Sequence, residues 1–155
     1  YFYNGFAFFD TLVDHQKMPA TGRMIAYIRR DELTHVTLFA NMMREIKKEF
    51  PSIYDENLVK EMMKKAVEQE IEWSKHILWN KIPGINEQTT EEYTHWLANE
   101  RLAMIGIAPL YPDAMKNPYK HLERLQDPNA DKGNFFETTV INYTQSSSMA
   151  GSWDF

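Results

Sequence analysis

The sequence contains no cysteine, and this absence excludes several kinds of protein. A disulfide framework, a thiolate metal site and a cysteine nucleophile are all ruled out. Any bound metal ion must therefore be held by carboxylate and imidazole groups. Such ligands favour the harder metals.

Two further absences narrow the class. No run approaches the roughly 18 consecutive apolar residues of a membrane span, and the start lacks the basic region and cleavage site of a signal peptide. The net charge is -5, and the 17 Lys and Arg are scattered along the chain, which argues against nucleic acid as a partner. We therefore expect a cytoplasmic protein that binds neither nucleic acid nor a membrane.

What the sequence does contain is helical periodicity. Its 155 residues, 43% of them hydrophobic, suffice for one domain with a sizeable core. Apolar residues recur with a period of ~3.6, and no segment alternates convincingly as a strand does. The predicted fold is therefore all-α, with helices long enough to form a bundle.

Proline, glycine and polar residues mark where the helices end. The first helix is expected to end near His15, before a connection over residues 17–22 that contains Pro19. Later helices are expected at 23–50, from 55 or 56 to 79, at 89–106 and, as a short return, at 120–125. The third helix should turn these residues inward: Val59, Met62, Ala66, Trp73 and Ile77. The segment 1–126 is predicted to form the bundle, and the polar segment 127–155 a flexible tail.

The second helix carries two ionisable residues within its apolar stripe. The stripe consists of Met24, Ile28, Glu32, His35, Phe39, Met42 and Ile46. Because burial of an unpaired carboxylate costs several kcal/mol, Glu32 and His35 should pair with each other, bond other buried groups, or bind a metal. Ferritin-like dimetal bundles use the Glu-x-x-His spacing on two helices. Spacing alone leaves a core pair and a ligand pair as open alternatives.

A second Glu-x-x-His occurs at Glu92 and His95. Here Thr89, followed by Glu92 three residues later, is typical of a capping box. We therefore expect Glu92 to serve the start of a helix and not a metal site.

The run "RRDELTH" (residues 29–35), preceded by "FYNGFAFF" (residues 2–9), resembles the small, radical-generating subunit of class I ribonucleotide reductase. The stretches "EIEW" (residues 70–73) and "NERLAMIG" (residues 99–106) extend the resemblance over nearly the whole chain. It implies a ferritin-like helical bundle, of which this chain is the C-terminal half. It also implies that Glu32 and His35 bind a dinuclear iron or manganese centre. Asp31 becomes a candidate relay of electrons and protons, with Arg30 as its usual neighbour.

The same resemblance assigns a radical-shielding pocket to Phe2, Phe6 and Ile28, and a dry pocket would slow the quenching of a radical.

The family's other metal ligands are an Asp, a first Glu-x-x-His and a lone Glu, and the lone Glu would fall three residues before Tyr1. The chain is therefore expected to be the second part of a small subunit divided by a split gene, an intein or proteolysis. It should need an N-terminal half to complete the site. Glu70 is not a ligand position in the family and is expected to pack against the tail or to form an ion pair.

The resemblance also gives the tail a role. In the family the extreme C-terminus docks on the large subunit, and a tail tyrosine passes the radical between subunits. Trp153 and Phe155 would then be anchors and Tyr143 the relay, with Tyr119 or Tyr111 as alternatives. A disordered segment can bury a few aromatic residues in a partner's groove at the cost of its own ordering.

The implied function is to help assemble and hold an oxygen-activated dimetal centre that generates a radical. The radical travels to the large catalytic subunit and starts the reduction of ribonucleotides to deoxyribonucleotides. The expected partners are the N-terminal half, a second small subunit and the large subunit, and this chain itself should not bind nucleotide. Two alternatives remain: a ferritin-like storage or oxidase protein, and a helical interaction module without metal.

Overall fold

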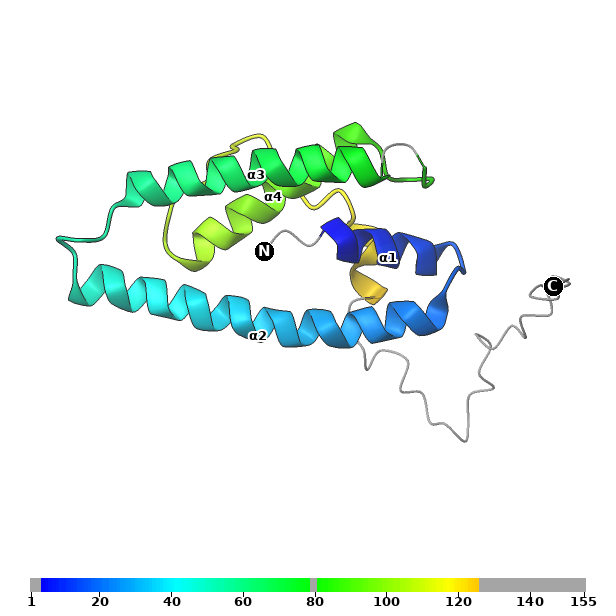
Figure 1. The fold of residues 1–155 in the computed structure, drawn as a ribbon, viewed down its shortest axis with the longest axis horizontal. Helices are drawn as coiled ribbons and strands as arrows, with labels where there is room; N and C mark the ends of the chain where they lie inside the picture. The colour runs from blue at the N-terminus through cyan, green and yellow to red at the C-terminus, as the bar shows by residue number, and fades with distance from the viewer. Residues whose placement is uncertain (1–3, 79–80, 126–155) are drawn as a thin grey trace, which may run out of the picture.

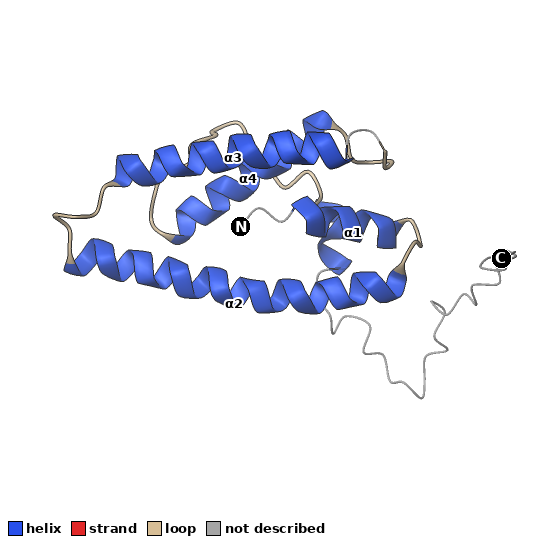
Figure 2. Ribbon diagram, in the orientation of Figure 1, coloured by secondary structure: helices blue, strands red, loops and turns tan. Residues whose placement is uncertain are grey.

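The computed structural model describes residues 4–78 and 81–125, and the regular elements of that part are all helices (Figures 1 and 2). They are α1 (Asn4–Asp14), α2 (Pro19–Glu49), α3 (Glu56–Leu78), α4 (Glu87–Met104) and the short 3-10 helix η1 (Lys120–Leu125). This confirms the all-α prediction, including the short return near the end. Within the described part, no helix is both long enough and apolar enough to span a membrane.

The helices form two antiparallel pairs. One pair is α1 with α2 and the other is α3 with α4, and these two pairings make the most extensive helix contacts. In Figure 1, α2 runs along one side of the molecule and α3 along the other. Helix α1 also touches η1, α3 and α4, so it joins the two pairs.

The core lies where α1, α4 and η1 meet. Its buried residues are Ala7, Tyr93, Leu97, Tyr119 and Leu122, with Trp96 and Leu125 packed against them. The burial of Leu122 explains why a short segment after several prolines returns to the bundle, because it covers an apolar patch on α1 and α4.

The first two helices approach each other closely at Gly22. A Cβ atom at Gly22 would lie 2.0 Å from Val13 Cγ2, so only glycine fits without a shift.

Helix α2 begins at Pro19, four residues before the predicted start at Arg23. That prediction was wrong because proline is well suited to the first turn of a helix, where its missing N–H has no partner to lose.

The start of α4 also differs from the prediction. Asn86 is the cap: its Oδ1 accepts a hydrogen bond from the Thr89 backbone N–H at 2.9 Å, and its own N–H donates to Thr89 Oγ1 at 3.1 Å. Thr89 is therefore the partner of the cap and not the cap itself. Glu92 accepts a bond from Gln88 instead. After the C-terminal end of α4, Gly106 has a φ of 72°. This is the left-handed conformation that the sequence predicted for a glycine at this position.

Asn99 of α4 holds the loop that follows. Its Nδ2 donates to the carbonyl oxygens of Tyr111 at 2.7 Å and Ala114 at 3.2 Å. Its Oδ1 accepts from the N–H groups of Leu110 at 3.0 Å and Tyr111 at 3.1 Å. One buried side chain thus satisfies four backbone groups in a loop with no regular structure of its own.

Candidate metal centre

Glu32 and His35 lie one turn apart on α2 and point in the same direction. His35 Nδ1 is 3.3 Å from Glu32 Oε2, while 60% of the His35 side chain and 44% of the Glu32 side chain are exposed. The pair is therefore accessible from outside the described bundle. Its carboxylate and imidazole are suitable ligands for iron or manganese.

The apolar stripe around this pair was predicted to be buried, and that prediction is wrong for this chain. Met24 is 66% exposed and Phe39 50% exposed. The buried side of α2 is a different one, and it carries Gly22, Ala26, Arg29, Val36 and Ala40. Those mostly small residues face the neighbouring helices because they allow close approach, and this leaves the large apolar residues uncovered.

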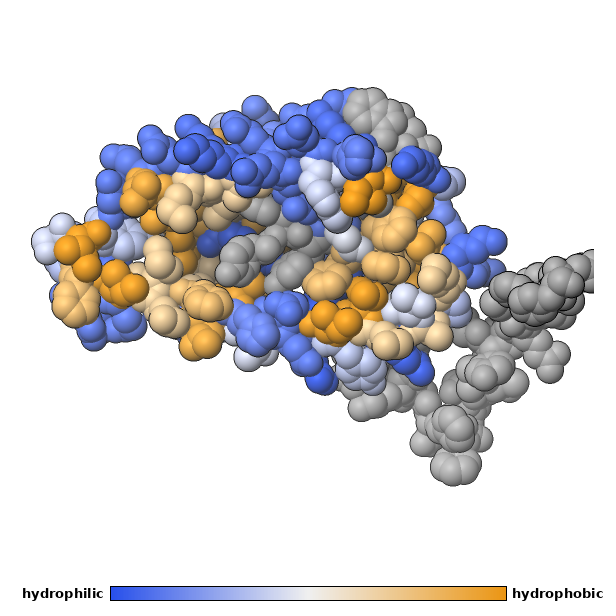
Figure 3. All heavy atoms as spheres, in the orientation of Figure 1, coloured by the Kyte–Doolittle hydropathy of each residue, from blue (hydrophilic) through white to orange (hydrophobic). Residues whose placement is uncertain are grey.

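Helix α3 repeats this arrangement. Met62, Trp73 and Ile77 were predicted to point inward but are exposed, whereas Val67 and Ser74 are buried. Figure 3 shows apolar side chains gathered along the edges of α2 and of the α3–α4 pair that face each other. We call these exposed residues the open face. On α2 they are Met24, Ile28, Glu32, His35, Phe39, Met42 and Ile46; on α3 they are Leu58, Met62, Trp73 and Ile77.

The ligand set on the open face is incomplete. Among residues 4–78 and 81–125, no group of three or more acidic or histidine side chains is close enough to hold a metal ion. Glu32 and His35 therefore supply two side chains that suit a carboxylate and imidazole site, which by themselves are too few to hold a metal ion.

Asp31 lies beside the Glu32–His35 pair but makes a local contact. Its Oδ1 accepts bonds from Arg30 Nε at 3.2 Å and Nη2 at 3.1 Å, and both side chains are largely exposed. The guanidinium of Arg30 also lies over the Tyr27 ring. The relay role of Asp31 stays a prediction.

Only part of the predicted radical pocket falls within the described residues. Phe6 is half-buried, with its ring 5.1 Å from Arg29 Cζ, and Ile28 lies on the open face. Phe2 falls outside the described residues. So do Tyr143, Trp153, Phe155 and the boundary between bundle and tail.

The alternative relay tyrosines both have structural contacts. Tyr119 is buried, and its hydroxyl donates to Thr89 Oγ1 at 3.1 Å. Tyr111 stacks on the imidazole of His95, with ring centroids 4.0 Å apart. His95 thus faces the loop after α4, and burial lowers its pKa below the ordinary 6.5.

Sequence reasoning missed a buried ion pair between α1 and α2. Arg29 Nη2 donates to Asp10 Oδ2 at 2.6 Å, with only 7% and 4% of the two side chains exposed. Burial raises the pKa of Asp10, although the charge and hydrogen bond of Arg29 act in the opposite direction. A signal was available, because Asp10 follows Phe6 by four residues and so shares its helix face.

Two other polar features were also absent from the predictions. Asn4 Nδ2 donates to Ser74 Oγ at 3.0 Å and to Thr94 Oγ1 at 2.9 Å, which ties α1 to α3 and α4. Burial raises the pKa of the half-buried Glu70 carboxyl, while the side chain and backbone of nearby Asn4 act in the opposite direction. Glu70 thus lies near α1, whereas its expected packing against the tail falls outside the described residues.

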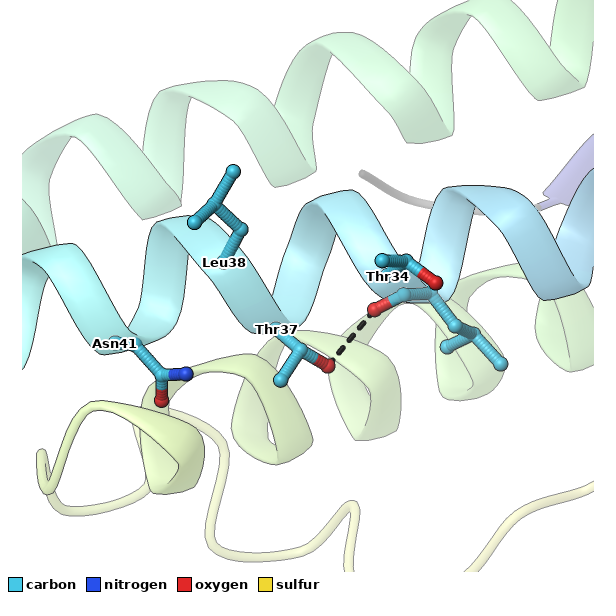
Figure 4. A pocket seen from close by; sticks show the side chains of 5 residues that line it. Thr34, Thr37, Leu38 and Asn41 are labelled. Carbon is cyan, nitrogen blue, oxygen red and sulfur yellow. Dashed lines mark hydrogen bonds between the residues drawn. The ribbon is translucent and has the colours of Figure 1, made fainter.

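A hollow on α2 offers no chemistry of its own. Its lining consists of Leu33, Thr34, Thr37, Leu38 and Asn41 (Figure 4). Thr37 Oγ1 donates to the Leu33 carbonyl oxygen at 2.8 Å. None of these five side chains titrates near neutral pH, so the ligand pair remains the candidate site.

Comparison with known proteins identifies the family to which the chain belongs. The family model for the ribonucleotide reductase small chain matches residues 1–118. The chain is 40% identical over 153 residues to the ribonucleoside-diphosphate reductase subunit beta of Halalkalibacterium halodurans, covering 97% of this chain and 44% of that protein. The corresponding protein of Treponema pallidum is 35% identical, with 96% and 44% covered.

A solved structure gives the same result. The ribonucleotide reductase R2 subunit from Clostridium botulinum matches with a TM-score of 0.77 and 42% identity, covering 82% of this chain and 41% of that one. The chain therefore spans less than half the length of the relatives it matches. These findings confirm the resemblance read from the sequence and the ferritin-like helical fold that it implied. The chain belongs to the ribonucleotide reductase small chain family.

Proposed function

We propose that this chain is part of the radical-generating small subunit of a class I ribonucleotide reductase that acts in the cytoplasm. The observation that carries the proposal is the Glu32–His35 pair, which lies on an exposed apolar stripe with its two side chains 3.3 Å apart. A carboxylate and an imidazole on an exposed apolar stripe are explained if other helices and a metal ion cover them.

In this proposal Glu32 and His35 hold part of a dinuclear iron or manganese centre. When bound, such a centre supplies the oxygen-activating chemistry that produces the radical. The chain's own contribution is to present a carboxylate and an imidazole from one helix turn, with apolar residues around them that keep water away once the face is covered. Carboxylate and imidazole ligands serve both metals, so the metal's identity depends on supply and on the remaining ligands.

The remaining ligands would come from the N-terminal half of the small subunit. Support comes from the open face, because large apolar residues on two helices are uncovered along the edges that face each other. Contiguous apolar surface of this kind marks an interaction site. The relatives are more than twice as long as this chain, so the missing length is available in the family.

A second small subunit and the large catalytic subunit complete the proposed assembly, which reduces ribonucleotides to deoxyribonucleotides. Asp31 and Tyr143 would carry the radical, Phe2, Phe6 and Ile28 would shield it, and Trp153 and Phe155 would anchor the tail. Deletion of residues 153–155 should abolish binding to the large subunit and leave metal content unchanged. Tyr143→Phe should bind normally and lose turnover. Undiminished binding or normal turnover would remove the respective role.

The deciding experiment is co-expression with the N-terminal half, followed by measurement of metal per complex. Glu32→Ala and His35→Ala should lose the metal. Glu92→Ala and His95→Ala are matched controls with the same spacing, and they should keep it. A complex without stoichiometric metal would support the metal-free interaction module, and tight two-metal binding by this chain alone would contradict the shared site.

A complex that binds metal must then be tested for turnover. Ribonucleotide reduction in the presence of a large subunit is the expected result. Metal binding without that activity would favour a storage or oxidase protein.

A further inference from the structure

Apart from the close approach of Val13 to Gly22, the buried side of α2 offers little to fix how the helix is rotated. Its buried residues are Gly22, Ala26, Arg29, Val36 and Ala40. Small side chains allow close approach, but they interlock weakly, and a core with loosely specified packing loses uniqueness before it loses stability. Arg29 is the one long side chain in this set.

Arg29 makes a directional contact that the small residues cannot make. Its Nη2 donates to Asp10 Oδ2 at 2.6 Å in a short, charge-assisted hydrogen bond. On its other side the guanidinium lies 5.1 Å from the centre of the Phe6 ring. Two groups of α1 therefore hold one side chain of α2 in a defined place.

The pair is a poor source of stability. Burial raises the pKa of the Asp10 carboxyl despite the nearby guanidinium, so loss of hydration outweighs the attraction. Arg29 Nη1 is buried and has no hydrogen-bond partner among the described residues. A buried donor without a partner costs free energy. Stability alone therefore does not explain why two charges lie in this interface.

We propose that Asp10 and Arg29 are positioning residues that fix the rotation of α2 about its own axis and thereby aim Glu32 and His35 at the open face. Glu32 lies three residues after Arg29 and His35 six, so both follow any turn of the helix at that point. A shift of one residue turns a helix by about 100°, and the helix with its side chains is ~10 Å across. Such a turn would remove both side chains from the open face. The metal part of this inference rests on the proposed function, whereas the rotational part does not.

The test is an apolar replacement of the whole pair, Asp10→Leu with Arg29→Met. A single replacement would leave an uncompensated buried charge and destabilise the chain for a reason unrelated to the rotation of α2. The matched control is Lys47→Met with Glu56→Gln, which removes another ion pair of α2 that is half-exposed. Because the chain has no cysteine, Thr37→Cys on α2 and Glu100→Cys on α4 can carry spin labels at two exposed sites.

We expect the apolar variant to keep its thermal midpoint or raise it. The distance distribution between the labels should broaden or shift by several ångströms, on the scale of the helix diameter. In the co-expressed complex, the Kd for Mn²⁺ should rise about tenfold, as is typical when the groups that orient ligands are removed. The control pair should change neither quantity.

Unchanged label distances in the apolar variant would overturn the inference. Unfolding of that variant would also overturn it, because the role of the pair would then be stability. If the unaltered complex binds no Mn²⁺, the proposed function fails, and the label distances still decide whether the pair sets the rotation of α2.

Discussion

Replacement of Asn99 by alanine should destabilise the chain through one identifiable loop. The Asn99 side chain makes four hydrogen bonds to the backbone of Leu110, Tyr111 and Ala114. At a net ~1 kcal/mol for each bond, with some of the freed groups reached by water, Asn99→Ala should lower the free energy of unfolding by ~2–4 kcal/mol. Asn99→Asp should be at least as harmful at neutral pH, because an oxygen then faces two carbonyl oxygens. Acidification should reduce this destabilisation, since a protonated carboxyl can donate one hydrogen bond to a carbonyl oxygen.

Denaturant unfolding followed by circular dichroism measures this loss, and hydrogen exchange locates it. The N–H groups of Leu110 and Tyr111 donate to Asn99 Oδ1, so their protection should fall in Asn99→Ala. Glu100→Ala is the control, because Glu100 is the exposed neighbour and its change should stay within about 0.5 kcal/mol. A loss below about 0.5 kcal/mol in Asn99→Ala, with protection unchanged, would refute the argument.

Two further predictions concern the contact between α1 and α2, and α4. Gly22→Ala should cost about 1–3 kcal/mol of unfolding free energy, because the new Cβ would lie 2.0 Å from Val13 Cγ2, and Val13→Ala should recover much of it in a double-mutant cycle. Additive effects of the two changes would show that the clash is absent. The lowered pKa of His95 means that the unfolded chain binds a proton more readily, so stability should fall as pH drops through 6.5 towards the folded pKa. His95→Gln should flatten that part of the profile, and an unaltered slope would contradict the assignment.

The ends of the helices were predictable where proline or glycine marks them. Pro51 follows the end of α2, and Gly106 takes the left-handed conformation after α4. The starts were less predictable because several residue types can cap a helix. Pro19 was taken for part of a connection although it occupies the first turn, and Asn86 rather than Thr89 caps α4.

The burial of the helix faces could not be predicted from periodicity. The spacing in α2 identified Glu32 and His35 as members of one apolar stripe, and the structure places them side by side. The spacing could not show that the stripe is exposed, because a repeat of 3 or 4 residues describes one helix and not the helices packed around it. The spacing of Asp10 from Phe6 indicated its helix face, but its pairing with Arg29 was missed because the two residues are 19 positions apart and only the packing of α1 on α2 brings them together.

The open face also affects the stability of this polypeptide against aggregation and degradation in the cell. Side chains as exposed as Met24 (66%) and Met62 (63%) are adhesive, and an apolar surface of this kind promotes self-association and attracts chaperones and proteases. A small excess of the uncovered form shifts the balance towards degradation, because quality control removes such chains continuously. Abundance of the chain in the cell would therefore follow the supply of whatever covers this surface.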